Sequence, residues 1–299
     1  KIKNLVKEGH SFASALSNFP ADFSSVYIGL VSVGEASGNL SFVLKKLAIF
    51  LESNNSLKQG ILSAITYPII VTMISLGIVA VLMTYVVPEV VNVLVSYDRE
   101  LPILTKILIW FSNFFFKWGI LLTILIIFIF TLFLVLYFSI HKIRFVVDSI
   151  LTKLPIIGGF IKLGESVLLA STLHIAISGG VSMIKSLKIS AKVVKNTFLK
   201  NQLYEVIESV KEGAELGRSL SRFSQFSPLL IQLISTGEKS GKLSGMLDVV
   251  VSELTKQLKH KALRLTLILE PLMILFTGLI VLLIVLAVMM PLIEINSII

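Results

Sequence analysis

Two short stretches carry the same chemically capable residues in the same order. Residues 34–40 read Gly-Glu-Ala-Ser-Gly-Asn-Leu, and residues 237–243 read Gly-Glu-Lys-Ser-Gly-Lys-Leu. Glycine-rich turns of this kind can bind phosphate through backbone N–H groups, as the phosphate loop of nucleotide-binding proteins does. The second stretch lacks that spacing, because its glycines are one residue too close and Leu243 stands where a hydroxyl must hold magnesium. The pattern therefore argues against a nucleotide site.

A structural role accounts for most of each stretch. Gly34 and Gly237 can end a helix in the left-handed conformation, and Ser37 and Ser240 can cap the next helix. The result is a tight turn between antiparallel helices. Such a turn does not require the glutamates, Glu35 and Glu238. Two readings of them stay open: a solvated or lysine-paired carboxylate, or a polar anchor at a contact between domains or with a partner.

Other chemistry finds little support in the chain. There is no cysteine, which excludes disulfides, thiolate catalysis and cysteine-based metal sites. The four histidines, His10, His141, His174 and His260, are scattered without metal-ligand spacing. His174 lies in an apolar helical pattern and is interpreted as a core residue. No set of side chains predicts a catalytic site, so the chain is not expected to be an enzyme.

Glu270 is an ionisable residue at the edge of an apolar stretch, which makes it a functional candidate by default. It precedes Pro271 and stands near Arg264. An interfacial position and an ion pair explain this carboxylate with fewer assumptions than a role in ion translocation. Glu270 and Pro271 are therefore kept as structural or interaction residues.

The chain contains an internal duplication. A constant shift of 203 positions carries Gly34 onto Gly237, and the same shift relates further pairs: Leu44 and Leu247, Leu51 and Leu254, Pro68 and Pro271, Pro88 and Pro291. Gly38 and Gly241 form another such pair. Each copy runs from a glycine-rich turn through an amphipathic helix into a long apolar segment.

The hydropathy pattern predicts an all-α membrane protein with two homologous helical-bundle domains and three transmembrane helices. Ala64–Val87 and Gly119–Ile140 lack charge over 24 and 22 residues, and about 20 residues suffice to span a bilayer. The predicted order is as follows: a first soluble domain at 1–63, a span at 64–88, a loop with an interfacial aromatic helix at 89–118, a span at 119–140, a second soluble domain at 141–266 and a span at 267–293. Pro68 is expected near the start of its span.

Charge predicts how the chain is oriented. Residues 141–266 hold 18 Lys and Arg against 9 Asp and Glu, whereas the loop at 89–117 has no net charge. Positive flanks favour the cytoplasmic side. The unpaired second span returns the second domain to the side of the first. Both soluble domains are therefore expected in the cytoplasm, with the loop and C-terminus outside.

With these features in place, the chain resembles the type II secretion system F family, which includes platform proteins of type IV pili, type II secretion and competence pili. The resemblance rests on the doubled Gly-Glu-x-Ser-Gly-x-Leu stretch, on the prolines that bound the spans, and on Leu101-Pro102, Leu154-Pro155-Ile156-Ile157-Gly158 and Ser178-Gly179-Gly180-Val181. It covers the whole chain. The first soluble domain is expected to be truncated, because about 60 residues between Pro155 and Gly217 have no counterpart before Gly9.

The resemblance implies a non-enzymatic scaffold in the bacterial inner membrane. Its implied partners are a hexameric assembly ATPase, pilins or pseudopilins, other inner-membrane assembly proteins, the lipid bilayer and further copies of the chain, but no nucleic acid. It also implies possible calcium ligands at Glu35 and Asn39, whose oxygen donors suit that ion. A small transporter or channel subunit is the alternative reading, although the predicted spans have no central charge.

Overall fold

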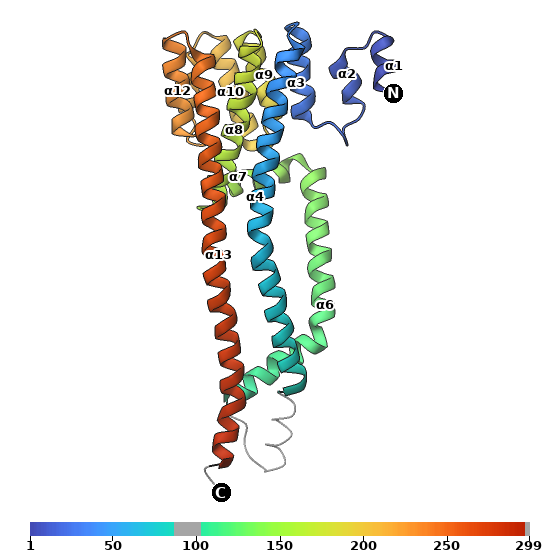
Figure 1. Ribbon diagram of the computed structural model, residues 1–299, viewed down its shortest axis with the longest axis vertical. Coiled ribbons are helices and arrows are strands. Elements are labelled where there is room, and N and C mark those ends of the chain that lie inside the picture. The colour runs from blue at the N-terminus through green and yellow to red at the C-terminus, as the bar shows by residue number, and fades with distance from the viewer. Residues whose placement is uncertain (87–102, 297–299) are drawn as a thin grey trace. The chain divides into compact units, whose positions relative to one another are not determined.

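The computed structural model describes residues 1–86 and 103–296, and within these ranges the chain forms helices and no strand. Figure 1 shows their order along the chain. The α-helices are α1 (Ile2–Lys7), α2 (Phe12–Ser17), α3 (Ser25–Ala36), α4 (Leu40–Val81), α6 (Ile103–Ser139), α7 (His141–Lys153), α8 (Ile157–Ser178), α9 (Met183–Val193), α10 (Thr197–Lys211), α11 (Leu216–Ser221), α12 (Pro228–Lys239) and α13 (Leu243–Asn296). A π-helical turn, η1 (Leu82–Val86), follows α4.

The helices form two compact units. The first contains residues 1–58 and 136–261, and the second contains 59–135 and 262–299. The first unit contains most of both soluble regions predicted from the sequence, 1–63 and 141–266. The long helices α4 and α13 belong partly to each unit.

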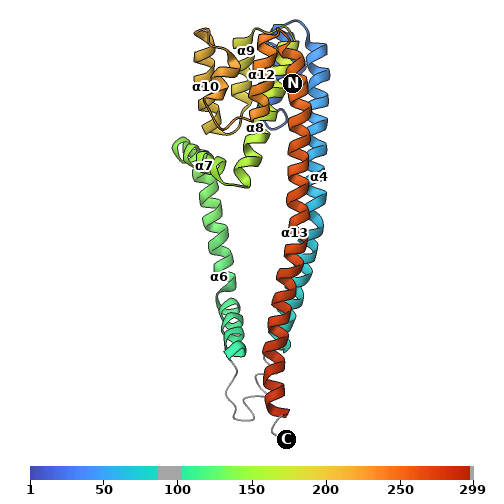
Figure 2. The ribbon, with the colours of Figure 1, turned by 90° about the vertical axis from the view of Figure 1, so that its left-hand side faces the viewer.

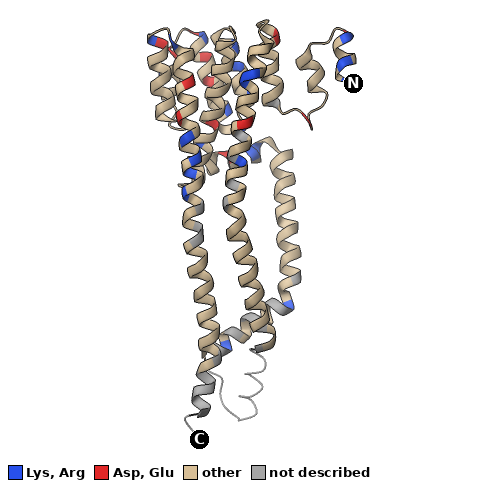
Figure 3. Cartoon of the chain, in the orientation of Figure 1, with Lys and Arg blue, Asp and Glu red and all other residues tan. Residues whose placement is uncertain are grey.

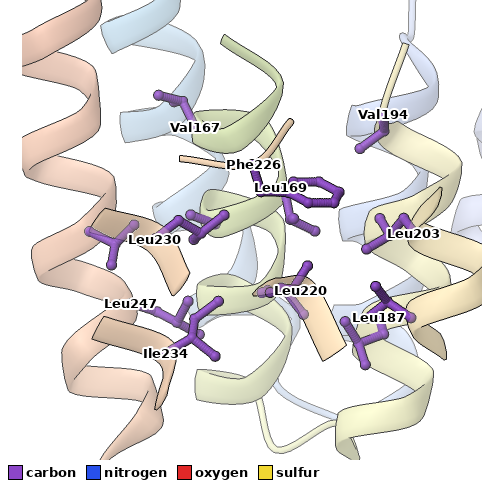
Figure 4. Packing of buried hydrophobic residues seen from close by; sticks show 14 of the residues in the cluster. Val167, Leu169, Leu187, Val194, Leu203, Leu220, Phe226, Leu230, Ile234 and Leu247 are labelled. Carbon is purple, nitrogen blue, oxygen red and sulfur yellow. The ribbon is translucent and has the colours of Figure 1, made fainter. Parts of the chain in front are cut away.

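The larger core of the first unit is built by α8 to α12 and the start of α13. Leu169, Leu203 and Leu247 are fully buried there. Figure 4 shows side chains from these helices meeting at one centre. The apolar positions repeat every three or four residues along each helix, so each helix turns one stripe inward. The predicted second bundle is thus present, and α8, whose apolar pattern contains His174, contributes buried residues to its core.

A second core joins the first copy of the repeat to the same bundle. Leu30 and Val33 of α3 are buried against Ile175 of α8 and Val193 of α9. Helices α3 and α9 pack closely here: a Cβ on Gly29 would make ordinary van der Waals contact, at 3.6 Å, with methyl groups of Ile189 and Val193. The first copy thus completes its core with helices of the second.

The second unit contains long apolar helices. Segments within α4 and α6 are long and apolar enough to cross a membrane, and Pro271–Ala287 is a shorter apolar stretch of α13. Helix α8 also meets the length and hydropathy requirement, but more than half of its apolar window is buried in the bundle core. Burial by protein explains its apolar character, so α8 is a core helix.

Two prolines lie inside long helices. Pro68, expected near the start of its span, lies in the interior of α4, which already begins at Leu40. Pro271, its repeat partner, likewise lies inside α13. A proline removes one N–H donor from the helix, and helices in apolar surroundings tolerate this because nearby groups satisfy the freed carbonyl. The hydroxyl of Thr72 donates to the carbonyl of Pro68 at 2.7 Å, which adds a local bond.

The aromatic segment before the second span is not a separate helix. It was predicted to lie at the interface before Gly119, but it is the first part of α6, which runs as one helix from Ile103 to Ser139. Trp110 stacks on Phe114 along this first part. The predictions for Pro88, for Leu101-Pro102 and for the loop between them lie outside the described residues.

Candidate functional site

Glu35 holds the start of a neighbouring helix. Its carboxylate accepts hydrogen bonds from the backbone N–H groups of Phe12 and, at 2.9 Å, Ala13. These are the first residues of α2, whose N–H groups have no partner within the helix. A carboxylate there also interacts favourably with the helix dipole. Ser11 adds a second cap by accepting from the N–H of Ser14 at 3.1 Å.

Glu238 repeats this arrangement in the second copy. Its carboxylate accepts from the N–H groups of Leu216 at 2.8 Å and Gly217 at 3.1 Å, the first residues of α11. The two glutamates are therefore internal anchors rather than solvated carboxylates or lysine partners. Of the two interpretations left open by the sequence, the polar anchor agrees better with these contacts. The helix that each glutamate anchors belongs to its own copy of the repeat, however, and not to another domain or a partner.

The glycines of each stretch serve a purpose different from the predicted one. Gly34 and Gly237 lie inside helices, and close packing explains their lack of a side chain. A Cβ on Gly237 would lie 2.9 Å from the Cα of Leu243, and one on Gly34 would lie 3.0 Å from the Cα of Leu40. The left-handed turn was predicted four residues too early: Gly38 and Gly241 adopt it, with φ of 68° and 66°.

The serines also differ from the prediction. Ser37 donates to the carbonyl of Gly34 at 3.3 Å, and Ser240 donates to the carbonyl of Thr236 at 2.8 Å. Both hydroxyls therefore bond back to the helix that is ending and do not cap the one that follows. The turn still joins consecutive helices, as expected.

The calcium ligands expected at Glu35 and Asn39 do not form a recognisable cluster. Both oxygens of Glu35 already accept N–H groups, and Asn39 is exposed. Within residues 1–86 and 103–296, no group of three or more His, Asp or Glu side chains is placed to hold a metal. The available donor set falls short of the six to eight oxygens that calcium takes from protein and water.

Asp148 is a buried carboxylate that the sequence analysis missed. It is 3% exposed and accepts from the N–H and hydroxyl of Thr197, each at 2.7 Å. Its other oxygen accepts from the hydroxyl of Tyr137 at 2.7 Å. Asp148 therefore ties the last turn of α6 to the start of α10. Its position in an amphipathic helix offered no local signal, because its partners are 11 and 49 residues away.

Glu165, on α8, holds the loop between α9 and α10. Its carboxylate accepts from the N–H groups of Lys195 at 3.1 Å and Asn196 at 3.0 Å. Burial raises the pKa of the Glu165 carboxyl, and the two N–H bonds oppose that shift. Asn196 in turn caps α10 by accepting from the N–H of Leu199 at 2.9 Å. Four carboxylates thus hold helix starts in this unit: Glu35, Asp148, Glu165 and Glu238.

His174 joins α8 to the helices of both repeats. Its Nδ1 lies 3.0 Å from the carbonyl oxygen of Ser244, which can only accept, so Nδ1 carries the proton. Its Nε2 lies 3.2 Å from a carboxylate oxygen of Asp248, and Lys46 reaches the same oxygen at 3.6 Å. Burial lowers the pKa of His174, and Lys46 reinforces this shift while the Ser244 carbonyl and Asp248 oppose it.

A cleft of about 320 Å³ opens beside this histidine, between α4, α8 and α13. Its polar lining includes the hydroxyl of Ser171, which is buried. His174 is a buried residue, as the sequence indicated, and it belongs to the joint between the two copies. Ser171, His174 and Asp248 all line this cleft. The two His174 ring nitrogens contact Ser244 and Asp248, and the buried Ser171 hydroxyl has no hydrogen-bond partner in the part of the chain that the structure describes.

Basic residues are the main feature of the surface of the second copy. Lys185, Lys188 and Lys192 are exposed on α9, three or four residues apart, and therefore share one face. Figure 3 shows charged residues concentrated on the helices of the first unit, while the described part of the second unit is almost free of them. Such a face suits an acidic partner.

The remaining predicted residues lie apart from these anchors. Pro68 and Pro271 are in the second unit, within the long helices. The backbone of Glu270 lies in α13, and its side chain falls outside the described part of the chain, so the expected pair with Arg264 stays a prediction. The described arrangement can position helices and present a charged surface.

Comparison with known proteins gives a consistent result. The family described as "Type II secretion system (T2SS), protein F" matches residues 1–88 and 169–291. The chain is 34% identical over 302 residues to type II secretion system protein F of Pseudomonas aeruginosa, covering 100% of this chain and 73% of that protein. It is 30% identical to type IV pilus assembly protein PilC of the same organism, covering 100% and 80%. PilC of Thermus thermophilus is 31% identical, with 99% and 72% covered.

Proposed function

Because this chain belongs to the type II secretion system protein F family, we propose that it is an inner-membrane platform for pilus or pseudopilus assembly. The observation that carries the proposal is the duplicated, carboxylate-anchored helical bundle continuous in sequence with apolar helices. A platform needs rigid surfaces for partners on the aqueous side and a fixed place in the bilayer. The names of the relatives favour this reading over the alternative of a small transporter or channel.

The platform acts without chemistry of its own in this proposal. A cytoplasmic assembly ATPase supplies the energy, and the platform passes its motion to pilin or pseudopilin subunits. The exposed lysines of α9 form a suitable docking surface for an acidic face of the ATPase. Opposite charges at a contact rim speed association and set specificity, and their effect weakens with salt.

The docking surface can be tested by reversing its charge. A triple variant, Lys185→Glu, Lys188→Glu and Lys192→Glu, is expected to capture less of the ATPase encoded with this protein at low salt. Lys239→Glu with Lys242→Glu is the matched control, because both residues are exposed but lie at the end of α12 and in the turn that follows it. Equal capture by the triple variant and the wild type at low salt would rule out α9 as the docking surface.

The proposed topology places the first unit in the cytoplasm and the C-terminus outside. It rests on the excess of Lys and Arg beside the apolar helices. Since the chain has no cysteine, single cysteines at Lys188 and at Glu208 can be probed with a membrane-impermeant thiol reagent. Labelling of either position in intact spheroplasts, before lysis, contradicts this orientation.

Self-association and calcium binding complete the proposal. A platform that contacts several subunits is expected to form dimers or larger assemblies, which the mass of the detergent-solubilised protein can test. Calcium at Glu35 and Asn39 stays a prediction: carboxylate and amide oxygens suit the ion, but here both Glu35 oxygens accept N–H groups of α2 and further ligands would be needed. It requires a calcium-dependent rise in melting temperature that Asn39→Ala removes, and no difference between calcium and a chelator would overturn it.

A further inference from the structure

Helix α7 has an apolar face that the described residues of its unit leave about half exposed. Val146 and Ile150 are each 54% exposed, and they stand one helical turn apart. The turn that follows continues this surface, with Leu154, Ile156 and Ile157 also exposed. A soluble helix normally turns such residues inward, so this face requires a partner.

The opposite face of α7 is fixed against the bundle, so the apolar face cannot rotate inward. Asp148 and Thr152 are buried on that side, and Asp148 is held by Tyr137 and Thr197. Phe145 also packs edge to face on Phe198 of α10, with ring centres 5.6 Å apart. The orientation of α7 about its own axis is therefore set by buried contacts.

The position of α7 in the chain indicates what covers the exposed face. Helix α7 begins at His141, and the preceding apolar segment, Lys117–Ser139, is long and hydrophobic enough to span a membrane. Figure 2 shows both helices, and a single residue separates them: Ile140, whose extended backbone (φ −111°, ψ 107°) ends one helix before the next begins. The first turn of α7 must therefore lie at the boundary between hydrocarbon and water.

The charges on this face fit the same boundary. Lys142, Val146, Ile150 and Lys153 follow at intervals of four, four and three residues, so two lysines flank the apolar pair on one face. Asp148 is the single acidic residue of α7 and points the opposite way, into the bundle. Apolar residues flanked by lysines are typical of helices that lie in the interface, where the lysines extend to lipid phosphates.

From these observations we propose that α7 and the turn to α8 form an in-plane membrane anchor. Val146, Ile150, Ile156 and Ile157 insert among the upper acyl chains, and Lys142 and Lys153 bind the phosphates of anionic lipids. The anchor holds the base of the bundle against the bilayer at a second place besides the spanning helices. It does not depend on which assembly the protein serves.

Single cysteines provide a direct test, because the chain contains none of its own. Full-length protein with Ile150→Cys is labelled with an environment-sensitive fluorophore and reconstituted into vesicles of phosphatidylcholine and phosphatidylglycerol at high lipid excess. Lys188→Cys on the exposed face of α9 and Glu208→Cys on α10 are the matched controls. The probe at 150 is expected to emit at shorter wavelength, to be quenched by lipid-attached nitroxide and to resist aqueous iodide, whereas both control probes show the reverse.

Two outcomes overturn the proposal. Iodide quenching at 150 as strong as at 188 means that the face lies in water. Protection at 150 that disappears on dilution with lipid means that another copy of the chain covers the face.

A second variant tests the role of the lysines. Lys142→Glu with Lys153→Glu is expected to lose lipid quenching at 150 in vesicles containing phosphatidylglycerol, while its helical circular dichroism is retained because both side chains are exposed. Undiminished lipid quenching in this variant contradicts the phosphate contacts.

Discussion

The hydroxyl of Tyr137 donates a 2.7 Å hydrogen bond to the carboxylate of Asp148, joining the last turn of α6 to a bundle helix. Tyr137→Phe removes this bond but keeps the ring that lies 5.7 Å from the Arg144 guanidinium. We expect a loss of about 1 kcal/mol in unfolding free energy, the usual net value of one hydrogen bond. Asp148→Ala should cost more, roughly 3 kcal/mol, because it also leaves buried donors of Thr197 without an acceptor.

Thermal unfolding in detergent can rank the wild type and the two variants. Asp148→Ala should lower the melting temperature most, and Tyr137→Phe should lower it less. Glu205→Ala, at an exposed position of α10, is the control and should leave the melting temperature unchanged. Equal melting temperatures for the wild type and Asp148→Ala would show that the bond network contributes nothing.

The two repeated glutamates, Glu35 and Glu238, should respond to substitution in the same way. Glu238→Ala removes the acceptor for the N–H groups of Leu216 and Gly217, and Glu35→Ala does the same for α2. Each is expected to lower stability by about 1–2 kcal/mol, whereas the glutamine variants should lose less, because an amide oxygen can still accept one N–H. Hydrogen exchange at the first residues of α2 and α11 measures the effect locally. Faster exchange throughout the bundle, without any local excess, would contradict the capping role.

Glycine positions allow a sharper comparison within one turn. Gly237→Ala would place a Cβ 2.9 Å from the Cα of Leu243 and 3.0 Å from the Cβ of Met246, which forces the helices apart. A loss of about 1–3 kcal/mol is expected from such overpacking. Gly245→Ala is the matched control, since its Cβ would meet no atom within 4 Å and alanine favours helix. Chemical denaturation should separate the two variants in opposite directions, and similar midpoints would refute the packing argument.

His174 predicts a pH dependence of stability. Burial lowers its pKa in the folded protein, so the unfolded chain takes up a proton more readily. Its contribution to stability is therefore complete above the ordinary histidine pKa of about 6.5 and declines as pH falls below it. The melting temperature is expected to fall more steeply between about pH 7 and 5 in the wild type than in His174→Gln. His10→Gln, at an exposed position, should behave as the wild type does.

The sequence predicted the repeat and the helices well, because both follow from local patterns. The 203-residue shift identified Glu35 and Glu238 as a pair, and apolar periodicity placed Leu247 and Leu254 in a core. It could not show what the glutamates bind, since the start of α11 lies 22 residues before Glu238 and the contact forms only after folding. Asp148 and Glu165 were missed for the same reason.

The conformation at Gly34 and the helix around Pro68 could not be read from sequence, for separate reasons. Glycine has two uses, left-handed backbone and close packing, and sequence alone did not show that Gly38 supplies the first and Gly34 the second. Proline usually marks a helix start in water, but α4 was already helical from Leu40. The first distinction depends on how closely the helices on either side of the turn pack, because the atoms that crowd Gly34 belong to Leu40 and Val43.

The shared core of α3, α8 and α9 imposes an order on biosynthesis. Helix α3 ends at Ala36 and α8 begins at Ile157, so the ribosome must make 120 intervening residues, including two apolar segments, before the partner helix exists. At 5–20 residues per second this takes roughly ten seconds. During that interval Leu30 and Val33 have no α8 or α9 to cover them, which makes the nascent first copy a substrate for chaperones that bind apolar segments.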